Sequence, residues 1–169
     1  MKFSDEELLK LFRLARQRND PKQRKWKSQG WNRNKSALAG HYDGIMAEMA
    51  VAKLLGVEIN EEIYEGGDDG SDLVLPDGRT IQVKHRGQRD WDYALNSADL
   101  DDFITDIGVL CQPTPEYDDD AVDVVGYITK EQFAERAFRT NFLKKPNGWR
   151  LAVQQKDMEP IEALLGVLV

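Results

Sequence analysis

The chain has 169 residues, enough for one domain with a real core, and 31% of them are charged, which excludes a predominantly apolar protein. No apolar run approaches the roughly 18 residues that span a bilayer, and residues 1–10 carry acids in place of the apolar stretch of a secretory signal. The single cysteine, Cys111, excludes an internal disulfide and lies in an apolar run, so we expect a buried thiol in a cytoplasmic protein.

The net charge of −7 hides a division along the chain. Residues 1–40 hold 11 Lys and Arg against 4 Asp and Glu, whereas the rest of the chain holds 12 against 26. Such asymmetry is typical of a segment that faces a polyanion and is attached to an acidic body.

Two helices separated by a basic segment are predicted at the start of the chain. Ser4 and the acids after it predict a capped helix that runs to about Arg18 and ends at Asn19-Asp20-Pro21. Residues 21–35 have no apolar periodicity and interleave basic side chains with two tryptophans. A second helix is predicted over residues 39–55, because Gly56 is a natural stop.

The remaining elements predict one mixed α/β domain. Residues 72–75 and 79–84 are strand-like and flank a turn, so they predict a β-hairpin. A polar loop with a short helix over residues 97–103 follows. The later elements are predicted as strands over 104–111 and 122–128, a helix over 129–138, a strand over 149–153 and a helix over 158–165. The acidic loop 113–120 is predicted to be solvated, because consecutive acids cannot all converge on one ion.

Glu48 is the first candidate functional residue. Its neighbours three and four positions away in the predicted helix carry no charge, so the helix presents a carboxylate from its packed face. A buried carboxylate costs several kcal/mol unless it is paired or binds a metal. A structural ion pair with a Lys or Arg is the alternative interpretation for Glu48.

The hairpin adds three polar side chains. Asp72 opens its first strand after a glycine-rich loop, and Gln82 and Lys84 are two residues apart, so both project from one face of the returning strand. An amphipathic surface strand would alternate in the same way. Carboxylate and amide oxygens are ligands for Mg²⁺ or Mn²⁺, and an ammonium beside the metal suits phosphodiester hydrolysis.

These residues resemble a known family. Glu48 in its helix, residues 67–72 with the sequence GDDGSD, and the Gln82-Val83-Lys84 ending resemble the PD-(D/E)XK nuclease superfamily, in particular its Mrr-like branch, where Gln replaces the acid. The resemblance covers about residues 40–138, and the compact chain is similar to small phage members.

The resemblance implies a restriction-endonuclease-like core, with a central mixed four- to five-stranded sheet flanked by helices. It implies a basic N-terminal helix and arm over 1–38, a nuclease core over 39–138, and a C-terminal strand and helix over 139–169, all in a single domain. It also implies Mg²⁺- or Mn²⁺-dependent cleavage of DNA, with Glu48, Asp72 and Gln82 around the metal and Lys84 as the catalytic lysine. Many proteins of this fold act as homodimers, and no membrane partner is expected.

Basic and aromatic residues are the candidates for contacts with DNA. His41 begins the second helix, although a capping or packing role is the alternative, and Arg86 follows the catalytic strand. The other candidates belong to the basic segment, whose alternative is a solvated arm: Lys22, Arg24, Lys25, Trp26, Lys27, Trp31, Arg33 and Lys35.

Two further interpretations stay open. Because Gln82 replaces an acid, the chain could be a catalytically inactive nuclease-fold module that binds DNA or another partner. The motif could also be fortuitous in an unrelated α/β protein, which requires Glu48 to be salt-bridged and far from Asp72.

Overall fold

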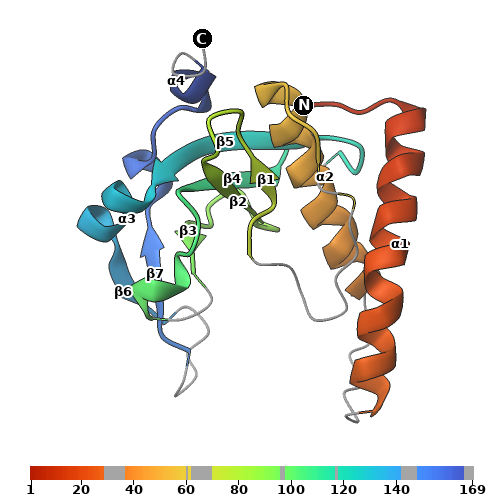
Figure 1. Cartoon of the computed structure of the whole chain (residues 1–169), viewed down its shortest axis with the longest axis horizontal. Helices are drawn as coiled ribbons and strands as arrows, with labels where there is room; N and C mark the ends of the chain where they lie inside the picture. Colours follow the sequence, from red (N-terminus) through yellow and green to blue (C-terminus); the bar gives the residue numbers. More distant parts are fainter. Residues whose placement is uncertain are drawn as a thin grey trace.

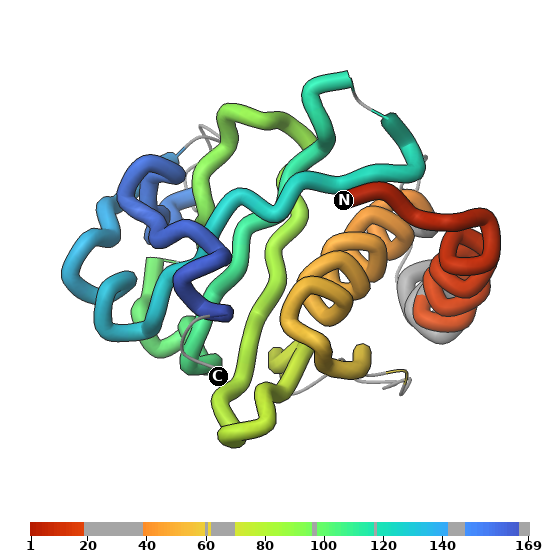
Figure 2. The backbone as a smooth tube through the Cα atoms, turned by 90° about the horizontal axis from the view of Figure 1, so that it is seen from above, coloured from red at the N-terminus to blue at the C-terminus, as the bar shows by residue number. Residues whose placement is uncertain are grey.

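The computed structural model describes residues 1–28, 37–59, 61, 70–95, 98–116, 118–141 and 148–165, and within these ranges the side chains of all but residues 19–28 and 37–38. A central sheet separates two layers (Figures 1 and 2). The long helices α1 and α2 lie on one side, and a small second sheet with α3 lies on the other. This is a mixed α/β fold, as the sequence predicts.

Helix α1 spans Asp5–Ser28 and packs against α2, which spans Ala37–Leu55. The predicted start of α1 is confirmed, because the Ser4 hydroxyl accepts from the Glu7 N–H and the Glu7 carboxylate accepts from the Ser4 N–H. The predicted end at Asn19-Asp20-Pro21 is wrong. Proline in a helix costs about 3 kcal/mol, but the following turns are rich in Lys, Arg and Gln, which favour helix. The backbone therefore continues through Pro21.

The central sheet has four strands in the order β1-β2-β4-β5. Strands β1 (Leu73–Val74) and β2 (Thr80–His85) form the predicted antiparallel hairpin, whose turn has Gly78 at φ +89°. Strand β4 (Ile107–Pro113) runs parallel to β2, and β5 (Val122–Thr129) runs antiparallel to β4. The four-stranded mixed sheet that the sequence predicts is therefore present.

A second sheet, in the order β3-β7-β6, was not predicted. Strands β3 (Tyr93–Ala94) and β6 (Phe138–Thr140) are too short to show a period, and they pair on either side of β7 (Arg150–Val153). The helix expected over 97–103 is a 3₁₀ turn, η1 (Leu100–Asp102), and a second 3₁₀ turn, η2 (Gln155–Asp157), follows β7.

The last two helices are shorter than expected. Helix α3 (Lys130–Arg136) begins at the predicted cap, Thr129, whose side chain completes a capping box with Gln132, and it ends where β6 begins. Helix α4 (Ile161–Leu165) begins directly after Pro160, because residues 158–159 extend along β5, where Glu159 and Tyr127 exchange backbone hydrogen bonds.

Each face of the central sheet has its own core. The α1–α2 side buries a large cluster that includes Leu11, Ile45, Val51, Ile81 and Val109. The β3–β7–α3 side buries a smaller cluster that includes Tyr93, Phe103, Leu110, Ile128 and Phe133. Cys111 is fully buried, as predicted, and burial raises the pKa of its thiol.

None of the helices among the described residues combines the length and the apolar character needed to cross a membrane.

Candidate functional site: Asp72, Gln82 and Lys84 on the hairpin

Asp72 lies directly against strand β2. Its N–H donates to the Ile81 carbonyl at 2.8 Å, and its Oδ2 accepts from the Val83 N–H at 2.6 Å. These two bonds contact the residues on either side of Gln82. A carboxylate that accepts a backbone N–H forms a strong, charge-assisted hydrogen bond. The Asp72 side chain is therefore fixed beside Gln82.

The backbone conformation of Gly70 places the following Asp72 beside β2. Its φ of +84° is one that L side chains rarely adopt. A Cβ at Gly70 would also lie 2.2 Å from Ile104 Cδ1, so a larger residue would clash. In this conformation the Gly70 carbonyl accepts from Gln82 Nε2 at 3.3 Å. Glycine at this position therefore brings the loop before Asp72 close to β2.

Gln82 is held from its other side by Tyr93, whose hydroxyl donates to Gln82 Oε1 at 3.4 Å. The Tyr93 ring is fully buried and fits because β4 has glycine at position 108, where a Cβ would lie 2.5 Å from the ring. Burial raises the pKa of Tyr93, and the negative charge of Asp72 raises it further. Tyr93 therefore stays protonated and serves as a hydrogen-bond donor.

Lys84 shares the face of β2 that carries Gln82. Alternate residues of a strand point to one side. Ile81 and Val83 pack into the α1–α2 core, whereas Gln82 meets Tyr93 in the opposite layer. In the parallel register Lys84 lies opposite Leu110, which belongs to that opposite core. Gln82 and Lys84 therefore share one face of β2, with Asp72 bonded to the backbone beside Gln82, and Lys84 is half-buried.

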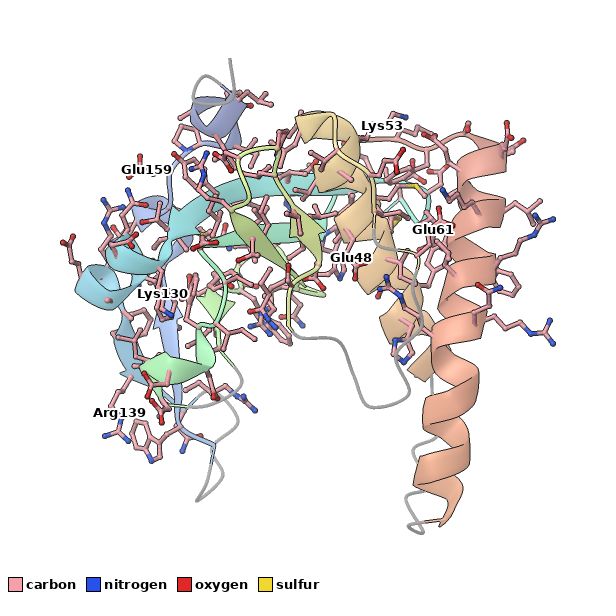
Figure 3. All side chains as sticks on the ribbon, in the orientation of Figure 1. Glu48, Lys53, Glu61, Lys130, Arg139 and Glu159 are labelled. Atoms are coloured by element: carbon pink, nitrogen blue, oxygen red, sulfur yellow. The ribbon has the colours of Figure 1, made fainter. Side chains whose placement is uncertain are left out.

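Glu48 forms a different contact. Figure 3 labels it on α2, and it is buried with 7% of its surface exposed. Arg18 Nη1, from α1, donates to Glu48 Oε1 at 3.0 Å and to Oε2 at 2.8 Å. This is the structural ion pair that the sequence left open as the alternative for Glu48. Arg18 had no sequence signal, because pairing across two helices depends on how they pack.

The donor set of the site fits a hard cation in part. Asp72 offers a carboxylate and Gln82 an amide oxygen, both ligands for Mg²⁺ or Mn²⁺. Both oxygens of Glu48 already accept from Arg18, so Glu48 is the weaker ligand of the three. Within the described ranges, no three His, Cys, Asp or Glu side chains form a group that could hold a metal ion.

The candidate DNA contacts fall into three places. Residues 22–27 form the last two turns of α1 in place of the predicted arm, and their side chains lie outside the described residues, as do Trp31, Arg33 and Lys35 altogether. His41 lies half-buried in the first turns of α2. Arg86 continues β2, where its N–H donates to the Cys111 carbonyl at 2.9 Å.

Arg86 is enclosed more than a surface cation would be. Its Nη2 donates to the Ala94 carbonyl at the edge of β3. Burial lowers the pKa of its guanidinium, and nearby Arg150 lowers it further. Arg86 therefore links the hairpin face to the second sheet, a contact that the sequence could not reveal because β3 was not predicted.

The acidic loop is tied to the N-terminus of the chain. Lys2 Nζ lies 3.1 Å from Asp118 Oδ2 and 3.7 Å from Asp120 Oδ1. Ion pairs of this kind at a surface contribute little to stability.

No protein-family model matches the chain, and no curated protein matches it either. The class that the structure defines is therefore a mixed α/β protein with an acid, an amide and a lysine on one β-hairpin.

Proposed function

We propose that this protein is a metal-dependent DNA nuclease of the PD-(D/E)XK type, which hydrolyses phosphodiester bonds. One observation carries the proposal. Asp72 is bonded to the backbone on both sides of Gln82, and Lys84 projects from the same face two residues further along β2. A carboxylate, an amide oxygen and an ammonium on one hairpin are the groups that this chemistry uses.

Each residue has a separate role in the proposal. Asp72 and Gln82 would hold Mg²⁺ or Mn²⁺, which when bound neutralises phosphate charge and makes a coordinated water more acidic. The Lys84 ammonium orients the attacking water and offsets the charge that develops on the phosphate. Tyr93 fixes the Gln82 amide with its oxygen toward the hydroxyl. The Arg18–Glu48 pair joins α1 to α2.

A second candidate function is a nuclease-fold module that binds DNA without cutting it. It is favoured by the bonding of Gln82, whose amide nitrogen and oxygen both have partners within the protein, Gly70 and Tyr93. A neutral ligand also leaves less negative charge for a divalent cation than a carboxylate would.

The test is cleavage of supercoiled plasmid, linear duplex and branched DNA with Mg²⁺, Mn²⁺ or EDTA. The wild type is compared with Lys84→Ala and with Lys130→Ala. Lys130 is an exposed lysine of α3 (Figure 3). We expect cleavage that needs a divalent cation, is lost in Lys84→Ala and is kept in Lys130→Ala.

Thermal unfolding of each variant is measured to verify that the variant is folded. Cleavage that persists in folded Lys84→Ala would overturn the assignment of Lys84. If the wild type binds DNA in a salt-dependent way but cuts none of the substrates with any cation, the binding module replaces the nuclease.

A further inference from the structure

The second sheet carries a hollow that the candidate nuclease site does not use. It is a cavity of about 450 Å³ on the face of β3-β7-β6 that points away from the central sheet. This volume lies within the range of small-ligand pockets. We call it the Trp91 hollow, and the residues that define it are Arg86, Trp91, Ala94, Phe138, Ala152 and Gln154.

The floor of the hollow is open because its central residues are small. Ala152 on β7 pairs with Ala94 on β3 and with Phe138 on β6, so the three side chains form one row across the sheet. Tyr93 and Val153, their neighbours along the strands, point to the opposite face and fill the core. The two methyl groups leave space beside the Phe138 ring, which is 39% exposed.

Trp91 contributes an exposed aromatic ring to the hollow from a loop whose backbone is fixed by hydrogen bonds. The Trp91 carbonyl accepts from Gln112 Nε2 at 2.7 Å and from Gln155 Nε2 at 2.9 Å, and Gln155 also donates to the Arg89 carbonyl at 2.8 Å. Gln112 is itself buried, with 1% exposure. The backbone at Trp91 is thus fixed, yet its side chain is 45% exposed. An indole held in this way is a platform on which a flat group can stack.

Charged side chains of both signs line the hollow. Arg86 provides a guanidinium at the side nearest β2, with Arg150 close enough to lower its pKa, and within the described part of the chain its Nε–H meets no acceptor. Asp90 and Asp92 also line the hollow, and the Asp92 carboxylate accepts from the Gln155 N–H at 3.3 Å. The guanidinium therefore suits an anion, and the carboxylates can accept hydrogen bonds from amino groups.

Arg86 links the hollow to the strand that carries Lys84. Arg86 follows Lys84 by two residues on an extended strand, so the two Cα atoms are about 7 Å apart and both side chains leave β2 on the same face. A strand of nucleic acid bound at Lys84 would reach the hollow with its next units.

We propose that the Trp91 hollow binds one unpaired nucleotide of a DNA strand, with the base stacked on Trp91 and Phe138 and its phosphate at Arg86. Stacking tolerates every base, and the carboxylates of Asp90 and Asp92 accept from base amino groups. A base inside a duplex cannot enter, because both of its faces are already stacked. The inference rests on the proposed nuclease function for the identity of the polymer, and it makes the substrate a DNA with a single-stranded part.

The test is the affinity of the full chain for labelled single-stranded DNA and for blunt duplex of equal length, measured by fluorescence anisotropy in EDTA. Trp91→Ala is expected to lower single-strand affinity roughly 5- to 100-fold and to leave duplex affinity unchanged. Trp91→Phe keeps most of the affinity, because a ring remains. The matched control is Trp149→Ala, since Trp149 is also exposed but stacks on Arg139 and is not part of the hollow.

Equal losses for single strand and duplex, or no loss in Trp91→Ala, would overturn the inference. A loss in Trp149→Ala of the same size would also overturn it. Because binding in EDTA needs no cleavage, these outcomes are separate from those of the nuclease test. If the wild type binds single strands through Trp91 but cuts no DNA, the nuclease proposal fails and the proposed nucleotide site stands.

Discussion

The two faces of strand β2 differ in what they contact. Ile81, Val83 and His85 face the long helices, and the first two belong to an apolar core. Gln82 and Lys84 face the second sheet, and the Gln82 amide donates to the Gly70 carbonyl and accepts from the Tyr93 hydroxyl. Residues on the helix face stabilise the fold, whereas those on the opposite face form a polar surface beside Asp72.

Glu48, which is buried, and Asp72, which is half-buried, are held by different partners. Glu48, on the helix side, is paired with Arg18 at short distance. Asp72, at the hairpin, accepts a backbone N–H from the strand that carries the candidate catalytic residues. A carboxylate held by a guanidinium is neutralised where it lies, whereas one held by a backbone amide keeps its full charge. The predictions that follow test this difference.

The largest expected effect is on cleavage in Asp72→Asn. The amide removes the negative charge that a cation needs, so we expect a loss of roughly a thousandfold or more in cleavage rate. Thermal stability should stay near that of the wild type, because the side-chain oxygen can still accept from the Val83 N–H. Asp77→Asn, in the exposed hairpin turn, is the matched control and should cleave normally. Equal rates in both variants would remove Asp72 from the site.

The next effect is on stability in Arg18→Ala. The variant leaves the Glu48 carboxylate buried without its guanidinium, and we expect the free energy of unfolding in urea to fall by about 3 kcal/mol. Arg16→Ala, on an exposed position of α1, should change little. The double variant Arg18→Met with Glu48→Leu should recover most of the loss, because two apolar side chains can replace a buried pair. Loss of cleavage in a stable double variant would instead give Glu48 a part in catalysis.

A smaller effect is expected in Gln82→Glu. The carboxylate loses the hydrogen bond to the Gly70 carbonyl and lies beside Asp72, so the melting temperature in EDTA should fall. Two carboxylates bind a divalent cation more tightly than one, so added Mg²⁺ should raise the melting temperature of the variant more than that of the wild type. An identical response to Mg²⁺ in both proteins would show that position 82 does not contact the ion.

The smallest effect concerns His85 on the helix face. Together with Tyr42, Asp43, Asp118 and Asp119, it lines a cavity of about 670 Å³. Burial lowers the pKa of His85, which Asp43 raises and Arg86 lowers to smaller extents, whereas burial raises the pKa of Asp43.

The pH dependence follows from the direction of the His85 shift. As pH falls through about 6.5, the unfolded chain takes up a proton that folded His85 does not, so the unfolding free energy should decrease until the lower folded pKa is reached. His85→Gln should flatten this slope in urea titrations between pH 7.5 and 5. Asp43 has the opposite effect at lower pH. Because its pKa is raised above 3.8 in the folded protein, it takes up a proton before the unfolded chain does, so its contribution to the unfolding free energy increases as the pH falls. If the slope is unchanged in His85→Gln, the pH dependence of the unfolding free energy comes from other groups.

Much of the central sheet was predictable from local pattern. Apolar alternation and turn residues place β1, β2 and β5 within a residue or two of the structure, and the Thr129 cap places the start of α3. β4 begins three residues later than expected, and Ile104, which precedes it, lies beside Gly70. Strands β3 and β6 escaped prediction, since two or three residues show no period and only pairing with β7 makes them strands.

The features of the candidate site also fall into two groups, those that local sequence sets and those that tertiary packing sets. The sequence by itself determined that Gln82 and Lys84 share a face and that Asp72 lies at the start of the hairpin, because side-chain alternation and hairpin pairing are local properties of a chain. Only the tertiary structure decided that Arg18 pairs with Glu48, that Tyr93 bonds to Gln82 and that a hollow opens beside Arg86. These contacts join residues from elements that are distant along the chain, and their geometry depends on how helices and sheets pack, which no local pattern encodes.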